Sequence, residues 1–179
     1  MNAILRFFAR LLGSGKPGGD YHDKSVPRYP WTAGPLAIFI SPEIPTERAA
    51  LIRKSLHRWN NALAGRFAIL DTISPDGAQI RYAIGDPATI GGEAHNAAGT
   101  KRHQVETPYP RFVADVVFRP ELLDSEFAEC AEHETGHALG VVEHSAEPGD
   151  AMFVGVNGRT GLTARDEKTI RRVYGVENE

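Results

Sequence analysis

Two histidines and a glutamate stand close together in the chain, as His133-Glu134 and, three residues on, His137. In a helix, residues four apart lie one above the other with Cβ atoms about 5–6 Å apart, so both imidazoles can converge on one metal ion. Zinc at about 2.0–2.1 Å from each nitrogen needs the nitrogens about 3.4 Å apart, which these side chains can reach. Glu134, rotated by about 100° from His133, flanks the ion without ligating it. The spacing therefore predicts a zinc site with Glu134 as general base.

Two candidates for a third ligand follow this pair. Gly140 lies three residues after His137, and Glu143 and His144 come shortly after it. We expect His144 to bind the metal, because a neutral imidazole leaves the site more positive than a carboxylate would and keeps a metal-bound water acidic. Glu143 is the alternative ligand.

Composition excludes several other classes of protein. The chain has 179 residues and a net charge of −3, which predicts one compact domain with a short extension and no nucleic-acid partner. Cys130 is the single cysteine and cannot form an internal disulfide, so a metal site has to use histidines and carboxylates. No apolar run reaches the length of about eighteen residues that a membrane-spanning helix needs.

Apolar residues repeat at three- and four-residue steps in the segments that must position this site. We expect helices over residues 46–63, 124–139 and 163–174, the second carrying the histidine pair. Gly140 follows that helix and predicts a left-handed turn at its end. Thr163 and Asp166 form a capping box at the start of the last helix.

Runs of β-branched and aromatic residues predict the strands. These strands cover residues 36–40, 67–70, 79–84 and 111–118, with a further short segment opening at Gly91. Residues 96–110 lack periodicity and are expected to form an exposed loop. The order strand, helix, four strands, helix, helix indicates an α+β, or mixed α/β, domain.

The first 30 residues differ in composition from the rest. Residues 2–12 are apolar but interrupted by Arg6 and Arg10, which predicts an amphipathic helix and no clear signal peptide. This helix either docks on the domain or makes peripheral contact with a membrane surface, and a cytoplasmic or membrane-peripheral location is favoured over export. We therefore divide the chain into residues 1–30, an amphipathic segment with a Gly/Pro-rich linker, and a domain over residues 31–179.

Other polar residues receive simpler interpretations. His57 is expected at the surface of the first helix, and Cys130 as a small buried apolar group. His22 or Asp23 could cover the site, although a disordered linker is the favoured reading of that segment.

The segment from His133 to Ser145, followed by Met152, resembles the zinc signature and Met-turn of the metzincin metallopeptidases, and looks most like the matrixin branch. More loosely, residues 31–174 follow the order of small bacterial matrixin-like catalytic domains. The resemblance implies a twisted, mostly parallel sheet of about five strands with three helices, and zinc on the second helix. It also implies an endopeptidase acting on protein or peptide substrates, with Met152 as an apolar floor beneath the histidines.

The chain departs from the matrixin pattern in two places. The usual third-ligand position is occupied by Glu143, with His144 one residue further on, and an extra loop residue after a glycine turn is easily absorbed. Phe153-Val154-Gly155 stands where matrixins more usually have Tyr-Pro, so the neighbouring specificity pocket should differ in shape.

Some matrixins hold a second, structural metal. His95 and His103 could contribute to such a site, whether for zinc or Ca²⁺, but the accompanying acidic and histidine spacing is missing. We therefore expect one Zn²⁺.

Two functions fit this reading. The first is a zinc-dependent endopeptidase in which Glu134 takes a proton from water and passes it to the leaving amine. The alternative is a non-catalytic binding module of the same fold that keeps zinc as a structural staple. A closed site in which Glu143 joins three histidines favours the module, and an open fourth position beside a free Glu134 favours the enzyme.

Overall fold

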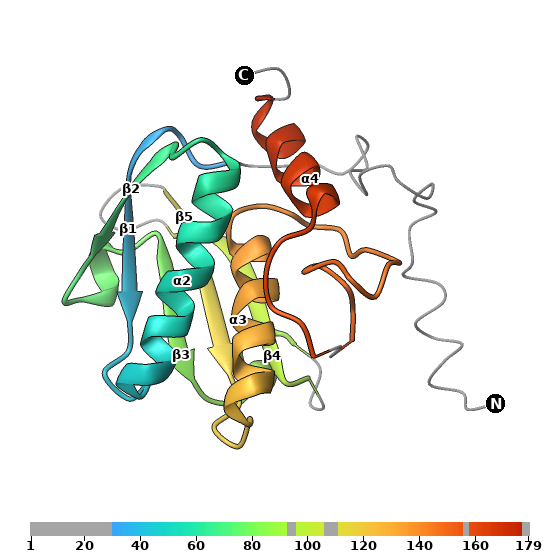
Figure 1. Ribbon diagram of the computed structural model, residues 1–179. Coiled ribbons are helices and arrows are strands. Elements are labelled where there is room, and N and C mark those ends of the chain that lie inside the picture. Colours follow the sequence, from blue (N-terminus) through green and yellow to red (C-terminus); the bar gives the residue numbers. More distant parts are fainter. Residues whose placement is uncertain (1–29, 93–95, 106–110, 156–157, 177–179) are drawn as a thin grey trace.

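The computed structural model describes residues 30–92, 96–105, 111–155 and 158–176. A single five-stranded sheet, in the order β2-β1-β3-β5-β4, forms its centre (Figure 1). The strands are β1 (Gly34–Ile40), β2 (Phe67–Asp71), β3 (Ile80–Ile84), β4 (Ala98–Val105) and β5 (Arg111–Phe118). All neighbouring pairs are parallel except β4 with β5, which are antiparallel. The expectation of a mixed α/β domain with a mostly parallel sheet is confirmed.

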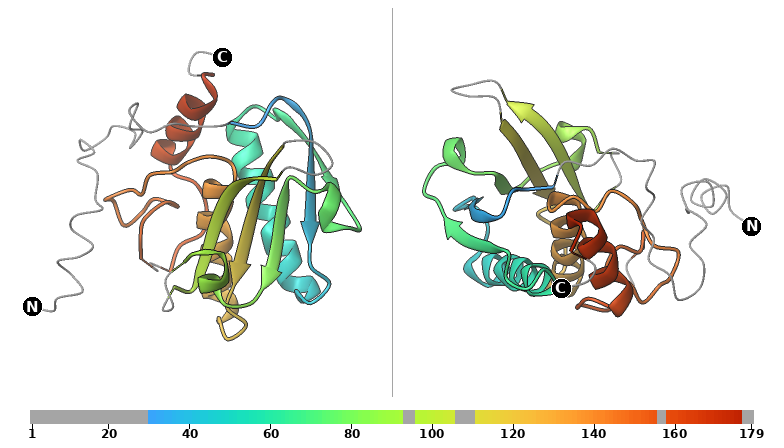
Figure 2. Two further views of the ribbon diagram at one scale, coloured as in Figure 1. Left: turned by 180° about the vertical axis from the view of Figure 1, so that it is seen from behind. Right: turned by 90° about the horizontal axis from the view of Figure 1, so that it is seen from above.

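Three α-helices are present in the described residues: α2 (Thr46–Ala62), α3 (Asp124–Ala138) and α4 (Ala164–Tyr174). Two short 3-10 helices, η1 (Pro75–Gly77) and η2 (Pro87–Ile90), lie in the connections. Figure 2 shows α2 and α3 side by side on one face of the sheet, with α4 near the end of α3. The Tyr174 hydroxyl donates to the Leu139 carbonyl at 2.7 Å and so ties α4 to that end.

The core lies between the sheet and α2 with α3. Ile52, Leu56 and Trp59 on α2 are fully buried, as the three- and four-residue apolar repeat predicts. The Trp59 indole donates to the Glu132 carbonyl at 2.9 Å, which fixes α2 against α3. Gly65, in a left-handed conformation with φ +73°, turns the chain from the end of α2 into β2.

The ends of the two later helices agree with the sequence. Gly140 adopts φ +108° just after α3. Thr163 and Asp166 form the expected capping box at the start of α4, and its last residue is followed by Gly175 at φ +68°. These cap signals depend on residues that are close in the sequence, so they can be recognised before the fold is known.

The expectation of a loop over residues 96–110 is wrong for its first half, because residues 98–105 form β4. This strand has little apolar periodicity because two positions on the same face as the buried Ala98 are polar. Thr100 hydrogen-bonds α3, and the Arg102 guanidinium lies 4.8 Å from the Trp31 ring centre. Main-chain hydrogen bonds to the antiparallel neighbour β5 hold this segment in an extended strand. The short segment expected at Gly91 is instead the end of η2, where Gly91 has φ +93°.

The described domain is packed from its first residues. Trp31 is buried, and its indole donates to the Ala138 carbonyl at 3.0 Å. Residues 2–12, His22 and Asp23 lie outside the described residues, so the expectations for them stand as made. Among the described residues, no helix combines the length and apolar character needed to cross a membrane.

Candidate metal centre

The two histidines of α3 are placed by close packing of the helix around Gly136. A Cβ at Gly136 would meet the Met152 sulfur and would lie 2.7 Å from Trp59 Cζ2. Glycine therefore lets α3 approach both α2 and the segment that holds Met152. Met152 is fully buried, and its sulfur lies next to Gly136 on the helix turn that carries the histidines, where an apolar floor was expected.

The turn at Gly140 brings the following loop back to the helix. The Gly140 amide donates to the His137 carbonyl at 2.9 Å, and the Val141 amide donates to the Gly136 carbonyl at 3.0 Å. These bonds satisfy carbonyls at the end of α3 while the left-handed glycine reverses the chain. The loop that follows delivers His144 to the same side as the helix histidines.

The three histidines converge through their Nε2 atoms. His137 Nε2 lies 3.1 Å from His133 Nε2 and 3.2 Å from His144 Nε2. One ligand atom from each of the three lies within 4.8 Å of the others. Tetrahedral zinc at about 2.0–2.1 Å from each nitrogen needs separations of about 3.4 Å, so this donor set fits the ion closely.

The opposite nitrogens of the two helix histidines are engaged by main-chain carbonyls. His133 Nδ1 lies 2.9 Å from the Ala151 oxygen, and His137 Nδ1 lies 2.6 Å from the Val141 oxygen. Because a carbonyl only accepts, each Nδ1 carries the proton and donates it. Each Nε2 then presents a lone pair to the centre of the cluster, as a metal ligand must.

The protonation state of the cluster suits a cation. Burial in the first place, and a neighbouring imidazole in the second, lower the pKa of His133, His137 and His144 to about 4 each. All three rings are therefore neutral near pH 7, and neutral imidazole is the form that binds zinc.

Glu134 lies beside this cluster without joining it. Its side chain is 7% exposed, and Oε2 accepts a hydrogen bond from the Thr100 hydroxyl at 2.7 Å. Burial raises the pKa of Glu134, opposed by His137 and by the bond from Thr100. A carboxylate with a raised pKa next to a metal ligand set is suited to accept and return a proton.

His144, and not Glu143, is brought into the cluster. Among the residues that the structure describes, the group able to hold a metal consists of the three histidines alone. A tetrahedral ion held by these three histidines would therefore keep a fourth position without a protein ligand from the described ranges.

The other described candidates from the sequence do not belong to the three-histidine group. His57 is exposed on α2, as expected. Cys130 is half-buried, and burial raises its pKa to about 12, so it is an unreactive thiol. His103 lies on β4 with Nε2 3.6 Å from an Asp115 oxygen, and His95 falls outside the described residues. The described residues contain no second cluster that gathers three metal-binding groups.

Sequence reasoning missed the residues that support the site from other elements. Thr100 was assigned to a loop, although it reaches Glu134 from β4. Asp166 was recognised as a cap, but its carboxylate also accepts from the Ala151 amide at 3.0 Å, and the Ala151 carbonyl in turn receives His133. The capping box was the one sequence signal that pointed to Asp166.

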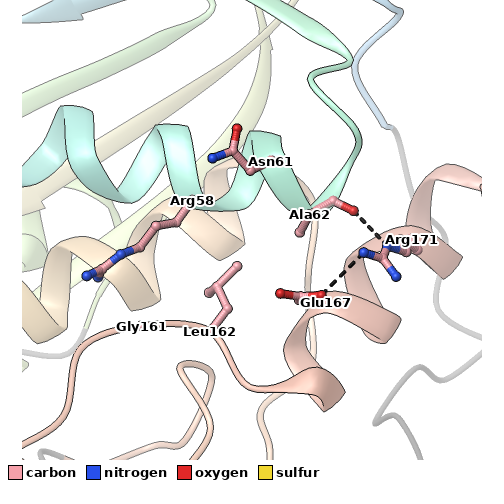
Figure 3. A pocket seen from close by; sticks show the side chains of 7 residues that line it. All are labelled: Arg58, Asn61, Ala62, Gly161, Leu162, Glu167 and Arg171. Carbon is pink, nitrogen blue, oxygen red and sulfur yellow. Dashed lines mark hydrogen bonds and ion pairs between the residues drawn. The ribbon is translucent and has the colours of Figure 1, made fainter.

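Figure 3 shows a separate cavity of about 410 Å³ between α2, α4 and the chain at Gly161. Its guanidinium groups are engaged: Arg171 donates to the Ala62 carbonyl and to Glu167, and Arg58 donates to Glu132. None of the three clustered histidines lines this cavity, and each of its charged groups has an ion-pair partner, Glu132 for Arg58 and Glu167 for Arg171. It therefore carries no mark of a ligand site.

No protein-family model matches this chain, and no curated protein is significantly similar to it. Any assignment of function therefore depends on the geometry of the histidine cluster and Glu134.

Proposed function

We propose that this protein is a zinc-dependent endopeptidase of the metzincin type, resembling the matrixins. One observation carries the proposal: His137 Nε2 lies 3.1 Å from His133 Nε2 and 3.2 Å from His144 Nε2, and this cluster lies beside a buried carboxylate that is outside the ligand set. A metal held by three imidazoles with a free fourth position is the arrangement used by zinc hydrolases.

His133, His137 and His144 would hold the ion. When bound there, zinc polarises a peptide carbonyl and lowers the pKa of water toward neutrality. Glu134 takes a proton from the attacking water while the water oxygen bonds to the carbonyl carbon. It then delivers that proton to the leaving amine as the carbon–nitrogen bond breaks. The second proton of water also passes to the leaving amine, so the products are one carboxylate and one ammonium group for each water consumed, and Glu134 returns to its starting state.

The alternative, a binding module with a structural zinc, has less support from the site. A closed structural site needs a fourth protein ligand, and Glu143 is the residue that the sequence offered for this role. Glu143 does not belong to the converging group in the described residues. Glu134 also lies buried beside the cluster without belonging to the converging group.

The test is cleavage of a diverse peptide library by the zinc-loaded protein, with and without a chelator. Glu134→Gln should retain about one zinc per chain and lose hydrolysis by at least about a hundredfold, since general-base catalysis contributes on that scale. Glu129→Gln, on the same helix, is the matched control and should leave turnover unchanged. Full turnover in Glu134→Gln would remove this residue from the mechanism. An absence of chelator-sensitive cleavage in the wild-type protein would favour the binding module.

A further inference from the structure

The contact between Thr100 and Glu134 joins two elements that are far apart in the sequence. Thr100 lies on the edge strand β4, where its main chain is in register with Val116 of β5. Its hydroxyl oxygen lies 2.7 Å from Glu134 Oε2 and 3.1 Å from the Glu134 main-chain oxygen. A hydroxyl has one hydrogen to donate. The shorter distance and the negative charge both favour the carboxylate as its acceptor.

This bond distinguishes the two oxygens of the carboxylate. Oε2 is engaged by Thr100, and no other hydrogen bond from the described residues to the Glu134 side chain is seen. We propose that Thr100 is a positioning residue for the base: by holding Oε2 against the sheet, it leaves Oε1 as the oxygen that receives the proton of water. The proposal rests on the proposed peptidase function and adds a residue from the sheet to its machinery.

The geometry gives this role a physical reason. Glu134 has three rotatable side-chain bonds, and an unrestrained carboxylate could turn away from the water or bind the metal itself. Thr100 is stiff, because its Cβ is branched and its strand is paired with β5 along its length. A hydrogen bond from a rigid strand therefore fixes the carboxylate more firmly than a bond from a mobile loop could.

Thr100→Val tests the inference, because valine has nearly the shape of threonine and lacks the hydroxyl. We expect kcat for peptide hydrolysis to fall by about tenfold or more, while KM stays within about twofold and the zinc dissociation constant is unchanged. Thr100→Ser keeps the hydroxyl and should retain kcat within about threefold of wild type. Thr100→Ala provides a second variant without the hydroxyl, should valine disturb the strand.

Three results would overturn the proposal: unchanged kcat in Thr100→Val and Thr100→Ala, an equal loss in Thr100→Ser, or loss of zinc together with kcat. The first would mean that the bond does not affect the base, the second that size matters and not the hydroxyl, and the third that Thr100 has a purely structural role.

A stability measurement separates this proposal from the proposed function. In the metal-free protein, Thr100→Val should lower the unfolding midpoint when Glu134 is present, and should have a smaller effect in a Glu134→Ala background. Equal shifts in both backgrounds would show that the bond does not form, whatever the activity. If the coupling is found but the wild-type protein cleaves no peptide, the peptidase function is at fault and the contact stands.

Discussion

At the scale of single residues, hydrogen bonds before and after His144 in the chain hold the loop that carries the third imidazole. Before His144, the turn at Gly140 and the hydrogen bond from the Val141 amide to the Gly136 carbonyl set where the loop leaves α3. After His144, the Ser145 amide donates to the Met152 carbonyl at 2.8 Å, and the Ser145 hydroxyl donates to the Asp150 carboxylate. These bonds hold the loop on both sides of His144, whose Nε2 lies 3.2 Å from that of His137.

We predict that His144→Ala lowers zinc affinity by orders of magnitude, because a direct ligand is lost. Glu143→Ala should change affinity by less than about tenfold, at the lower limit of the range for residues that only orient ligands. Titration of both variants with zinc against a competing chelator gives the two dissociation constants. If Glu143→Ala empties the site and His144→Ala does not, the Glu143 carboxylate is the third ligand and the assignment of His144 is wrong.

At the scale of elements, α4 supports the histidine cluster although none of the three histidines lies on it. Asp166, fully buried at the start of α4, accepts from the Thr163 amide at 2.8 Å and from the Ala151 amide at 3.0 Å. The Ala151 carbonyl then accepts from His133 Nδ1 at 2.9 Å. A chain of hydrogen bonds therefore runs from the helix cap to one imidazole, and the cap helps to fix the orientation of that ring.

Asp166→Asn should weaken zinc binding by about tenfold, because an amide accepts hydrogen bonds less strongly than a carboxylate and its nitrogen cannot accept at all. Glu167→Gln is the matched control, since Glu167 is the next residue and pairs with Arg171 at the surface; its zinc affinity should equal that of wild type. The same chelator competition measures both variants. Equal affinities in Asp166→Asn and wild type would show that the cap stabilises α4 without affecting the ligand.

The elements differ in how far the sequence predicts them. Helices α2 and α3 and the buried strands carry periodic apolar residues, so their positions follow from local pattern. Strand β4 could not be predicted in this way, because inward residues such as Thr100 are polar and are satisfied by α3. The spacing of the histidine motif gave the three histidines and Glu134. The contacts of Thr100, Ala151 and Asp166 depend on tertiary packing, which a linear pattern does not encode.

At the scale of the whole molecule, the histidine cluster makes the metal-free fold sensitive to acid. In the folded state the pKa of each ring is lowered to about 4, whereas in the unfolded chain histidine has a pKa of about 6.5. Between these values the unfolded chain binds more protons than the folded one. The contribution of these histidines to the free energy of unfolding is therefore complete above about pH 6.5 and is lost as the pH falls toward 4.

We predict that the thermal midpoint of the metal-free protein falls steadily from about pH 6.5 to about pH 4. The midpoint of His144→Asn should fall less steeply, because one of the three histidines with a lowered pKa is gone. The midpoint of His57→Asn, a substitution at an exposed position on α2, should follow that of the wild type. Comparing the variants removes the contribution of the carboxylates, which titrate in all three proteins. Saturating zinc should raise the midpoint near pH 7 and lose this effect below about pH 6, where protons compete for the imidazoles. Identical slopes in wild type and His144→Asn would mean that the cluster does not control acid stability, and zinc protection persisting at about pH 4.5 would argue against a histidine ligand set.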